Sequence, residues 1–369
     1  MKRIAIAAGG SGGHIFPAIA LGRSLSACGK DIDILHIGSD KALDRRIFEK
    51  EGVRYSMLSA NKLSYGISPR TALAFFRLLA DVFRAVSIIR SYRPDVAVGF
   101  GGYVSFPVVF AAKLFGIPSI VHEQNVVPGR ANRLLFRLAR KIAVSFEETS
   151  GHIGRYAGKC VLTGNPVRAE ISRSLRLAEG GLSGPSGKKF TILVIGGSQG
   201  ASFLNRTFIA AVSSMDAGSR SSIQAIHITG VKDYEWASRS YADIGIEHRV
   251  HSFVDRIEDA YAAADIVVTR SGASAIFELA LLRKPMILVP YPFAMSHQLD
   301  NALVFSGRGA ALLAEEKDLD AGRFAGIILA LMKDANRVKA LSEAAGRLAK
   351  PHAADDLARE VMDLTRNLR

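Results

Sequence analysis

The first residues that could do chemistry form a glycine turn with a histidine directly behind it. Residues 9–14 read Gly-Gly-Ser-Gly-Gly-His and follow an apolar run. A glycine turn at the start of a helix presents backbone N–H groups and a positive dipole end to a phosphate. The same helix end favours a neutral imidazole at His14, which could accept a proton as a general base. The alternative is a histidine that only caps the helix or packs against it.

A second polar cluster, His-Glu-Gln-Asn at 122–125, follows the apolar run at 117–121. It falls at the carboxyl end of a predicted strand, where open α/β folds bind their ligands. Such a density of hydrogen-bonding side chains suits a polyhydroxylated ligand, although at least two of the four are expected to bond within their own loop. Glu123 is the second candidate for the base, because only distances to a bound acceptor could separate it from His14. Tyr103, after another predicted strand, is placed to stack on or hydrogen-bond a sugar.

The second half of the chain carries a matching set of polar turns. Residues 196–200 repeat the glycine turn after a predicted strand. Residues 270–272 open a predicted helix that contains Glu278, whose carboxylate could accept hydrogen bonds from two neighbouring ribose hydroxyls. The alternative for Glu278 is a surface glutamate that stabilises a helix start. Gln298 lies in a polar loop after a further predicted strand and could bind sugar hydroxyls.

The sequence holds no convincing signature of a metal or a cofactor. Neither glycine turn continues as a dinucleotide fingerprint or as a P-loop. The two cysteines, Cys28 and Cys160, show no metal spacing and no disulfide framework, which is typical of a reducing compartment. The Asp-Ile-Asp at 31–33 begins a predicted strand, so we assign it to structure. No motif requires a cofactor and stimulation by Mg²⁺ stays open; Arg168 and helix N-termini would then offset the charge of a leaving group.

Strands rich in Ile, Val and Ala must position these turns. Apolar runs alternate with longer helical patterns, which indicates parallel βαβ units, and the pattern restarts halfway along the chain. The predicted strands are 3–8, 32–37, 95–99, 118–122 and 141–145, then 190–196, 223–228, 265–268, 286–289 and 310–313. We therefore predict an α/β chain of two doubly wound parallel-sheet domains, 1–165 and 166–351. Residues 178–189, rich in Gly and Ser, are predicted to form a surface loop.

The charge balance of the chain favours an anionic partner. The 369 residues include 48 Lys and Arg against 34 Asp and Glu, a net charge of +14. Nucleic acid, anionic lipid and phosphorylated substrates would all suit this charge. The basic residues are dispersed and no nucleic-acid-binding motif occurs, so no nucleic acid is expected. The longest uncharged stretch, 96–112, is divided by glycines and a proline, and neither a transmembrane helix nor a signal peptide is expected.

Segment 69–91 is predicted to form a helix with a wide apolar face. Arg70, Arg77, Arg84 and Ser91 recur every seven residues, while apolar side chains fill much of the remaining circumference. One interpretation is a buried crossover helix with a single solvated stripe. The other is a basic, apolar surface that lies on an anionic membrane.

Seven motifs, in order along nearly the whole chain, resemble those of the MurG family. These are the bacterial peptidoglycan glycosyltransferases that add N-acetylglucosamine to undecaprenyl-diphosphate-linked muramyl-pentapeptide. The motifs are GGSGGHIFPA (9–18), GGYVSFP (101–107), HEQNVVPGRANR (122–133), GNPVR (164–168), GGSQGA (196–201), RSGASAIFE (270–278) and HQLDNA (297–302). Two positions depart from the family pattern, since Ala275 stands where the family usually has Thr and Phe106 where it usually has Gly, which would change local contacts.

This resemblance implies a GT-B fold, in which two Rossmann-like domains face each other across a cleft and a C-terminal helix, 352–369, packs back on the first domain. It implies a hexosyltransferase that uses UDP-N-acetylglucosamine (UDP-GlcNAc) and inverts the anomeric centre, with His14 or Glu123 as the base. The backbone of Val254 would bind the uracil and Glu278 the ribose. The other substrate-binding residues implied by the resemblance, to which Tyr103 is added from its place after a strand, are Ser11, Gly12, Gly13, Asn125, Arg168, Ser198, Ala273, Ser274, Ala275, Ile276, Phe277 and Gln298.

The resemblance also implies partners and a location. The partners are UDP-GlcNAc, the undecaprenyl-linked muramyl-pentapeptide and an anionic membrane surface, with cell-wall and division proteins as further candidates. The location is peripheral, on the cytoplasmic face of the bacterial inner membrane, in a role that supports cell shape and cell division. Two other interpretations stay open. A UDP-GlcNAc 2-epimerase would share the architecture without needing a lipid acceptor, and a non-catalytic module would bind sugar nucleotide or lipid diphosphate without turnover.

Overall fold

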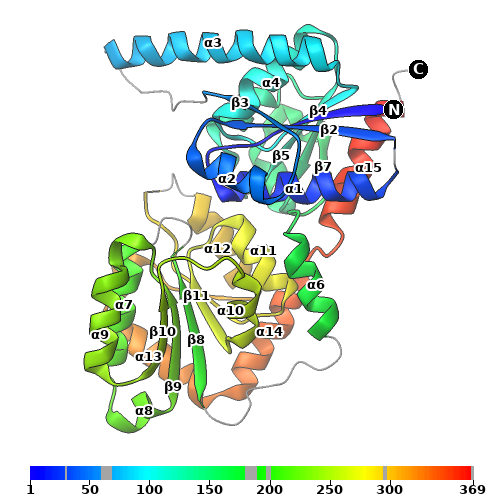
Figure 1. Ribbon diagram of the computed structural model, residues 1–369. Helices are drawn as coiled ribbons and strands as arrows, with labels where there is room; N and C mark the ends of the chain where they lie inside the picture. Colours follow the sequence, from blue (N-terminus) through cyan, green and yellow to red (C-terminus); the bar gives the residue numbers. More distant parts are fainter. Residues whose placement is uncertain (30, 60–68, 179–188, 197–200, 294–296, 367–369) are drawn as a thin grey trace. The chain divides into compact units, whose positions relative to one another are not determined.

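The structure is a computed structural model that describes residues 1–369 except 30, 60–68, 179–188, 197–200, 294–296 and 367–369 (Figure 1). The chain divides into two compact units, one of Met1–Arg168 with Lys350–Arg369 and one of Ala169–Ala349. Each unit is built on one parallel sheet, which confirms the predicted α/β class. Nearly all of the predicted surface loop at 178–189 lies outside the described residues.

Within the described residues the first sheet has seven parallel strands in the order β3-β2-β1-β4-β5-β6-β7. The strands are β1 (Lys2–Ala7), β2 (Ile32–Ser39), β3 (Tyr55–Leu58), β4 (Val96–Gly99), β5 (Ser119–Glu123), β6 (Lys141–Val144) and β7 (Cys160–Leu162). The helices of this unit are α1 (Gly12–Ala27), α2 (Ala42–Lys50), α3 (Pro69–Tyr92), α4 (Gly102–Leu114), α5 (Arg130–Leu135) and α15 (Ala353–Arg366), with short 3-10 helices η1 (Glu147–His152) and η2 (Gly154–Lys159).

The second sheet has six parallel strands among the described residues, in the order β10-β9-β8-β11-β12-β13. The strands are β8 (Phe190–Ile195), β9 (Ile223–Ile228), β10 (Glu247–His251), β11 (Ile266–Thr269), β12 (Met286–Leu288) and β13 (Leu312–Leu313). The helices of this unit are α6 (Ala169–Ala178), α7 (Ser202–Ser213), α8 (Ala217–Ser221), η3 (Val231–Asp233), α9 (Tyr234–Ile244), α10 (Ile257–Ala263), α11 (Ala273–Leu281), α12 (His297–Gly307), η4 (Glu316–Asp318), α13 (Ala321–Lys333) and α14 (Ala335–Leu348).

The alternation of side chains along β1 produces two helical layers in the first unit. Ile4 and Ile6 are fully buried in the cluster that includes residues of α1 and α15. Ala5 and Ala7 are buried in the cluster on the other face, together with residues of α3 and α4. Figure 1 shows the sheet between these two pairs of helices. The C-terminal helix α15 is therefore part of the core of the first unit.

The first unit extends slightly further along the chain than the predicted domain 1–165. The guanidinium of Arg168 lies over the ring of Phe16 in α1, 4.7 Å from its centroid. Gly164 has a φ of +81°, and an added Cβ there would lie only 2.6 Å from the Cβ of Lys350. Residues 166–168 and Lys350 therefore belong to the first unit. The second unit, Ala169–Ala349, is shorter at each end than the predicted domain 166–351.

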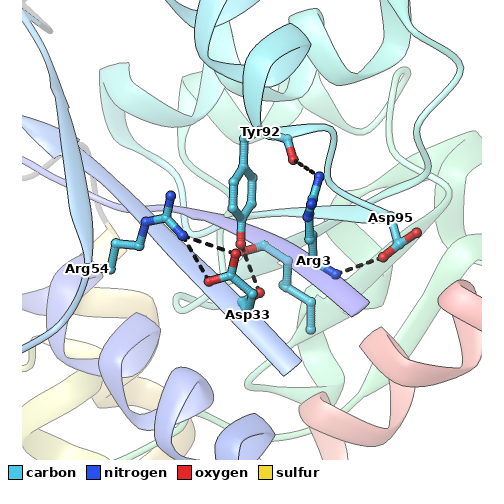
Figure 2. A network of polar contacts seen from close by, with 6 residues as sticks. Arg3, Asp33, Arg54, Tyr92 and Asp95 are labelled. Carbon is cyan, nitrogen blue, oxygen red and sulfur yellow. Dashed lines mark hydrogen bonds and ion pairs between the residues drawn. The ribbon is translucent and has the colours of Figure 1, made fainter. Parts of the chain in front are cut away.

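Polar contacts fix the amino ends of β1, β2 and β4 (Figure 2). Nη1 of Arg54 donates to both oxygens of the Asp33 carboxylate at 3.1 Å, and the Tyr92 hydroxyl donates to the Asp33 carbonyl at 2.8 Å. The backbone N–H of Arg3 donates to the Asp95 carboxylate at 2.7 Å. Asp33 therefore has the predicted structural role: it helps to stabilise the amino edge of the sheet, opposite to the edge that carries the glycine turns.

Candidate active site

The strand order of the first sheet reverses between β1 and β4, which is where open α/β folds bind ligands. Ala7 of β1 pairs with Gly99 of β4, so the two strands end side by side. Each strand runs into a glycine turn, at 9–13 and at 101–102. The two glycine turns and His14 therefore share one edge of the first sheet.

Both turns require glycine for steric reasons. Gly10, Gly101 and Gly102 have φ values of +85°, +87° and +72°, where other residues are strained. An added Cβ on Gly9 would lie 2.7 Å from Oδ2 of Asp44, which is closer than real Cβ contacts allow. The backbone of these turns is therefore packed closely against its neighbours, and no larger residue fits at these positions.

The first turn of α1 is open to a ligand. Ser11, its N-cap, makes no side-chain capping bond to the described residues. Ser11 and Gly12 are partly exposed, and Gly13 is exposed. Because the first turn of a helix presents backbone N–H groups and a positive dipole end, this position suits the binding of a phosphate by Ser11, Gly12 and Gly13.

His14 lies in the first turn of α1 and packs on the second glycine turn. Added Cβ atoms would lie 3.4 Å from its Cε1 on Gly101 and 3.6 Å from its Cδ2 on Gly102. Burial lowers the pKa of His14 below the ordinary 6.5, while the nearby carboxylates of Glu123 and Asp44 oppose that shift. Nδ1 is buried and has no hydrogen-bond partner among the described residues, yet the residue as a whole stays partly exposed. The ring is therefore neutral near pH 7 and can accept a proton.

Glu123, the second candidate for the base, is only 1% exposed and fully hydrogen-bonded. Oε1 accepts from the backbone N–H of Asn125 at 2.9 Å and from its side-chain amide at 3.2 Å. Oε2 accepts from the backbone N–H of Gly129 at 3.0 Å and from the amide of Asn132 at 2.8 Å. This carboxylate organises the loop between β5 and α5, and its four partners favour that role over proton transfer.

His122 and Gln124 are buried and bond to the framework. Nε2 of His122 lies 3.0 Å from the carbonyl oxygen of Gly164, and its Nδ1 lies 3.1 Å from Nε2 of Gln124. The Gln124 amide also donates to the carbonyl of Phe100 at 3.0 Å. Burial lowers the pKa of His122 to about 4, so this ring stays neutral. Asn125 is the partly exposed member of the 122–125 cluster.

The second sheet reverses its strand order between β8 and β11, and α11 begins there. Glu278 on α11 is 3% exposed, and its Oε2 accepts a hydrogen bond of 3.3 Å from the hydroxyl of Tyr261. It is therefore not the surface glutamate of the alternative interpretation. Ile276 and Phe277 are buried in the core, so that only their backbone could reach a ligand; Ala273 is also buried, whereas Ser274 and Ala275 are partly exposed.

Side-chain bonds shape the loop that carries Gln298. The hydroxyl of Ser271 donates to the carbonyl of Gln298 at 2.7 Å, and Oε1 of Gln298 accepts from the backbone N–H of Tyr291 at 2.9 Å. The amide of Asn301 donates to the carbonyl of Ser271 at 3.1 Å. Gln298 is therefore held against the turn that opens α11.

The remaining predicted residues are placed as follows. Tyr103 lies in the first turn of α4 and is partly buried against the core of the first unit. Arg168 lies over Phe16 and thus near the start of α1. Val254 follows β10 and is partly exposed. Ser198 lies outside the described residues.

Two buried charged groups at these edges were not predicted. Asp44, in the first turn of α2, bonds to the first glycine turn. Arg270, 8% exposed, pairs with Glu316 and donates to the carbonyl of Val289 at 3.0 Å. An acidic residue in a first helical turn is common, so the sequence offered no distinguishing signal for Asp44. Arg270 begins the motif at 270–278, which could have marked it.

Comparisons with known proteins identify the family. The glycosyltransferase family 28 N-terminal domain matches residues 4–144, and the family 28 C-terminal domain matches residues 191–357. A curated relative from Nitratidesulfovibrio vulgaris is 37% identical, and the match covers 96% of this chain and 95% of the relative. A relative from Desulforudis audaxviator is also 37% identical, with 96% of each chain covered. Both are named UDP-N-acetylglucosamine--N-acetylmuramyl-(pentapeptide) pyrophosphoryl-undecaprenol N-acetylglucosamine transferase.

Solved structures agree with this. Acinetobacter baumannii MurG is similar with a TM-score of 0.77 and 25% identity, over 98% of this chain and 100% of that one. A UDP-GlcNAc 2-epimerase from Neisseria meningitidis has a TM-score of 0.69 and 11% identity over 100% of both chains, which shows a shared fold alone. The two parallel-sheet units thus have the predicted GT-B fold. The chain belongs to the family of UDP-N-acetylglucosamine--N-acetylmuramyl-(pentapeptide) pyrophosphoryl-undecaprenol N-acetylglucosamine transferases.

Proposed function

We propose that the protein transfers N-acetylglucosamine from UDP-GlcNAc to the C4 hydroxyl of undecaprenyl-diphospho-N-acetylmuramyl-pentapeptide, in peptidoglycan synthesis. The donor and the acceptor follow from the names of the relatives. The observation that carries the proposal is His14, a neutral and partly exposed histidine between two glycine turns in a chain of this family.

In this reaction the acceptor oxygen attacks the anomeric carbon directly, so the configuration inverts. The bond from that carbon to the UDP oxygen breaks as the glycosidic bond forms, and His14 takes the hydroxyl proton. Because Nδ1 of His14 is buried, Nε2 is the proposed proton acceptor. The negative charge of Glu123 favours the protonated ring that results. We assign Glu123 to positioning the loop that carries Asn125.

We assign the UDP moiety to the second unit. Glu278 would accept hydrogen bonds from the ribose, the backbone of Val254 would bind the uracil, and Gln298 would bind the sugar. Arg168 and the helix N-termini would offset the charge that develops on the departing UDP. We propose that no resident cofactor takes part; activity measured in EDTA, and again with added Mg²⁺, tests this and separates a requirement from stimulation.

The acceptor is a lipid, and we propose that the first unit binds an anionic membrane surface through α3. Phe76, Leu79 and Phe83 of this helix are 66%, 38% and 73% exposed, and Arg77 and Arg84 are exposed beside them. The opposite side of α3 buries Ala85 and Ile89 in the core. A helix that exposes both aromatic and basic side chains is typical of a membrane surface. Among the described helices, none is long and apolar enough to cross a membrane.

Charge supports the same proposal. The first unit holds 28 Lys and Arg against 15 Asp and Glu, whereas the second holds 20 against 19.

A hollow of about 600 Å³ at the amino edge of the first sheet is lined by basic side chains. Five cationic side chains line it, and its described lining includes no carboxylate; the five are Lys113, Arg137, Arg140, Lys141 and Lys159. Leu114 and Phe115, 60% and 45% exposed, follow Lys113 directly. We propose that the protein lies peripherally on the cytoplasmic face of the inner membrane.

Transfer of radiolabelled N-acetylglucosamine to a short-chain lipid-linked muramyl-pentapeptide tests the proposed function. Lipid-linked product is the expected result. Conversion of UDP-GlcNAc to its 2-epimer without any acceptor would instead support the epimerase interpretation. Binding of UDP without lipid-linked product and without the 2-epimer would support the interpretation as a non-catalytic binding module.

A further inference from the structure

Asp44 is a buried charged residue that the proposed reaction does not use. It lies in the first turn of α2 and is fully buried. Its Oδ2 accepts three hydrogen bonds, from the backbone N–H of Gly10 at 2.9 Å, the backbone N–H of Ser39 at 3.0 Å and the Ser39 hydroxyl at 2.6 Å. One carboxylate oxygen therefore ties the first glycine turn to the end of the neighbouring strand β2.

The charge of Asp44 alone does not explain its presence, because it favours the protonated ring of His14 less than the charge of Glu123 does. Removing a carboxylate from water is costly, and this one lies beside a turn that suits the binding of a negatively charged phosphate. Its second oxygen, Oδ1, is also buried and has no hydrogen-bond partner within the described part of the chain. Electrostatic repulsion would weaken the binding of a phosphate there, whereas the three hydrogen bonds at Oδ2 fix the position of the first glycine turn.

That geometry extends from the first glycine turn to His14. An added Cβ on Gly102 would lie 3.1 Å from the carbonyl oxygen of Gly9, so the two glycine turns are in close contact. The second turn in turn packs on the imidazole of His14, with an added Cβ on Gly101 lying 3.4 Å from Cε1. A displacement of the first turn would therefore be felt at the proposed base.

We propose that Asp44 is a positioning residue for the transfer: by holding Gly10, it fixes the first glycine turn where the acceptor meets His14. This inference rests on the proposed function. It assigns to the buried carboxylate a role in aligning the acceptor, and none in proton transfer or in binding UDP-GlcNAc.

Two substitutions separate the hydrogen bonds of Asp44 from its charge. In Asp44→Asn the amide oxygen can take the place of Oδ2 and accept the same three hydrogen bonds. The amide nitrogen then takes the place of Oδ1, which accepts no hydrogen bond from the described residues. We expect this variant to retain activity within about fivefold. Asp44→Ala leaves Gly10 and Ser39 without their acceptor, and we expect kcat/KM for the lipid acceptor to fall on the order of 100-fold, as for a displacement of about 1 Å. KM for UDP-GlcNAc should stay unchanged in both variants.

Asp95→Ala is the matched control. Asp95 also accepts a backbone N–H, from Arg3, but at the opposite edge of the same sheet. Equal losses of activity in Asp44→Ala and Asp95→Ala, or a failure of Asp44→Asn to retain activity, would overturn the inference. Should Asp44→Ala not fold, Asp44→Glu, which keeps the charge and moves both oxygens, is expected to lose activity where Asp44→Asn keeps it. Absence of turnover in the unaltered protein would contradict the proposed function instead.

Discussion

The two units of the molecule share a strand order, yet they differ in charge and in the side chains held at the carboxyl edge of each sheet. Almost all of the net positive charge lies on the first unit. Its edge keeps a histidine with a buried, unbonded nitrogen. The edge of the second unit also holds a histidine with a buried, unbonded Nδ1, His297, but its loop is fixed by the Arg270–Glu316 pair and by the contacts of Ser271 with Gln298 and Asn301.

This difference indicates that a few side chains can adapt one architecture to bind different ligands. In our proposal the second unit has a small soluble ligand to hold, and a pre-bonded loop suits that task. The first unit has a lipid-linked ligand and a proton to take, which suits a basic surface and a partly exposed base. Substitutions that affect one unit alone are therefore the sharpest tests of the comparison.

The largest effect is expected at the base. His14→Ala should lower kcat by about 1,000-fold, the range of general base catalysis, because no other partly exposed imidazole lies between the glycine turns in the described structure. UDP binding, measured by calorimetry, should be unchanged, because we assign it to the other unit. A variant that keeps its turnover would move the base elsewhere, with Glu123 next in line.

The membrane surface should give the next largest effect. Replacing Arg77 and Arg84 by Ala should weaken binding to anionic vesicles by about 30-fold, since each basic side chain near such a surface contributes about 1 kcal/mol. The matched control replaces two exposed arginines of the second unit, Arg239 and Arg337, by Ala. Flotation of vesicles in low and high salt measures both pairs. Equal losses in the two pairs would show that overall charge, and not α3, determines binding.

A smaller effect is expected at the ribose. Glu278→Gln keeps the size of a buried side chain but removes its charge, so the affinity for UDP should fall about tenfold, as expected for the loss of a charge-assisted hydrogen bond. Vesicle binding should not change, because that property belongs to the first unit. Unaltered UDP affinity would remove Glu278 from the proposed site.

The smallest effect concerns acid stability. Burial lowers the pKa of His14, of His36 and His122 (both to about 4) in the first unit, and of His227 (to about 3) in the second. Since these groups titrate near 6.5 when unfolded, the unfolded state binds more protons below that pH. The contribution of these neutral histidines to the free energy of unfolding should therefore be fully present above about pH 6.5 and should be lost as the pH falls toward 4. The first unit, which holds three of the four, should unfold first.

The only tryptophan of the chain makes this measurable. Trp236 lies on α9, so its fluorescence follows the second unit, while far-UV circular dichroism follows both. Circular dichroism should change at a higher pH than the fluorescence does. Coincident transitions would mean that the two units unfold together. His36→Leu should narrow the difference, because neither ring nitrogen of His36 has a hydrogen-bond partner in the described structure.

Much of the fold was predictable because apolar runs reveal buried strands. The residues Ile4 to Ala7 are fully buried and were predicted as part of a strand from their composition. The strand β10, Glu247–His251, was missed because it lies at a sheet edge and reads Glu-His-Arg-Val-His, with no apolar run. The strands β3 and β7, at the two edges of the first sheet, were missed because runs of four and three residues are too short to stand out.

The site was predictable where a strand leads directly into a polar turn, and not where it depends on distant residues. The turns at 9–14 and 122–125 follow their strands in sequence. The bond between Asp44 and Gly10 joins residues 34 positions apart, and the packing of α2 against β2, the neighbour of β1, brings them together. Burial likewise distinguishes His14 from Glu123, and a linear sequence does not reveal the burial of a single polar side chain.

The position of α15 has a consequence for the order in which the protein is made. The helix covers one face of the first sheet beside α1, where Ser24 donates to Asp355 at 2.6 Å and Lys2 donates to Thr365 at 2.8 Å. The ribosome synthesises it only after the whole second unit. Until then the nascent chain lacks the side chains that α15 adds to the cluster around Ile4 and Ile6, and apolar surface exposed in this way is prone to aggregation. A chain that stops before α15 would therefore contain the complete second unit and an incomplete first unit.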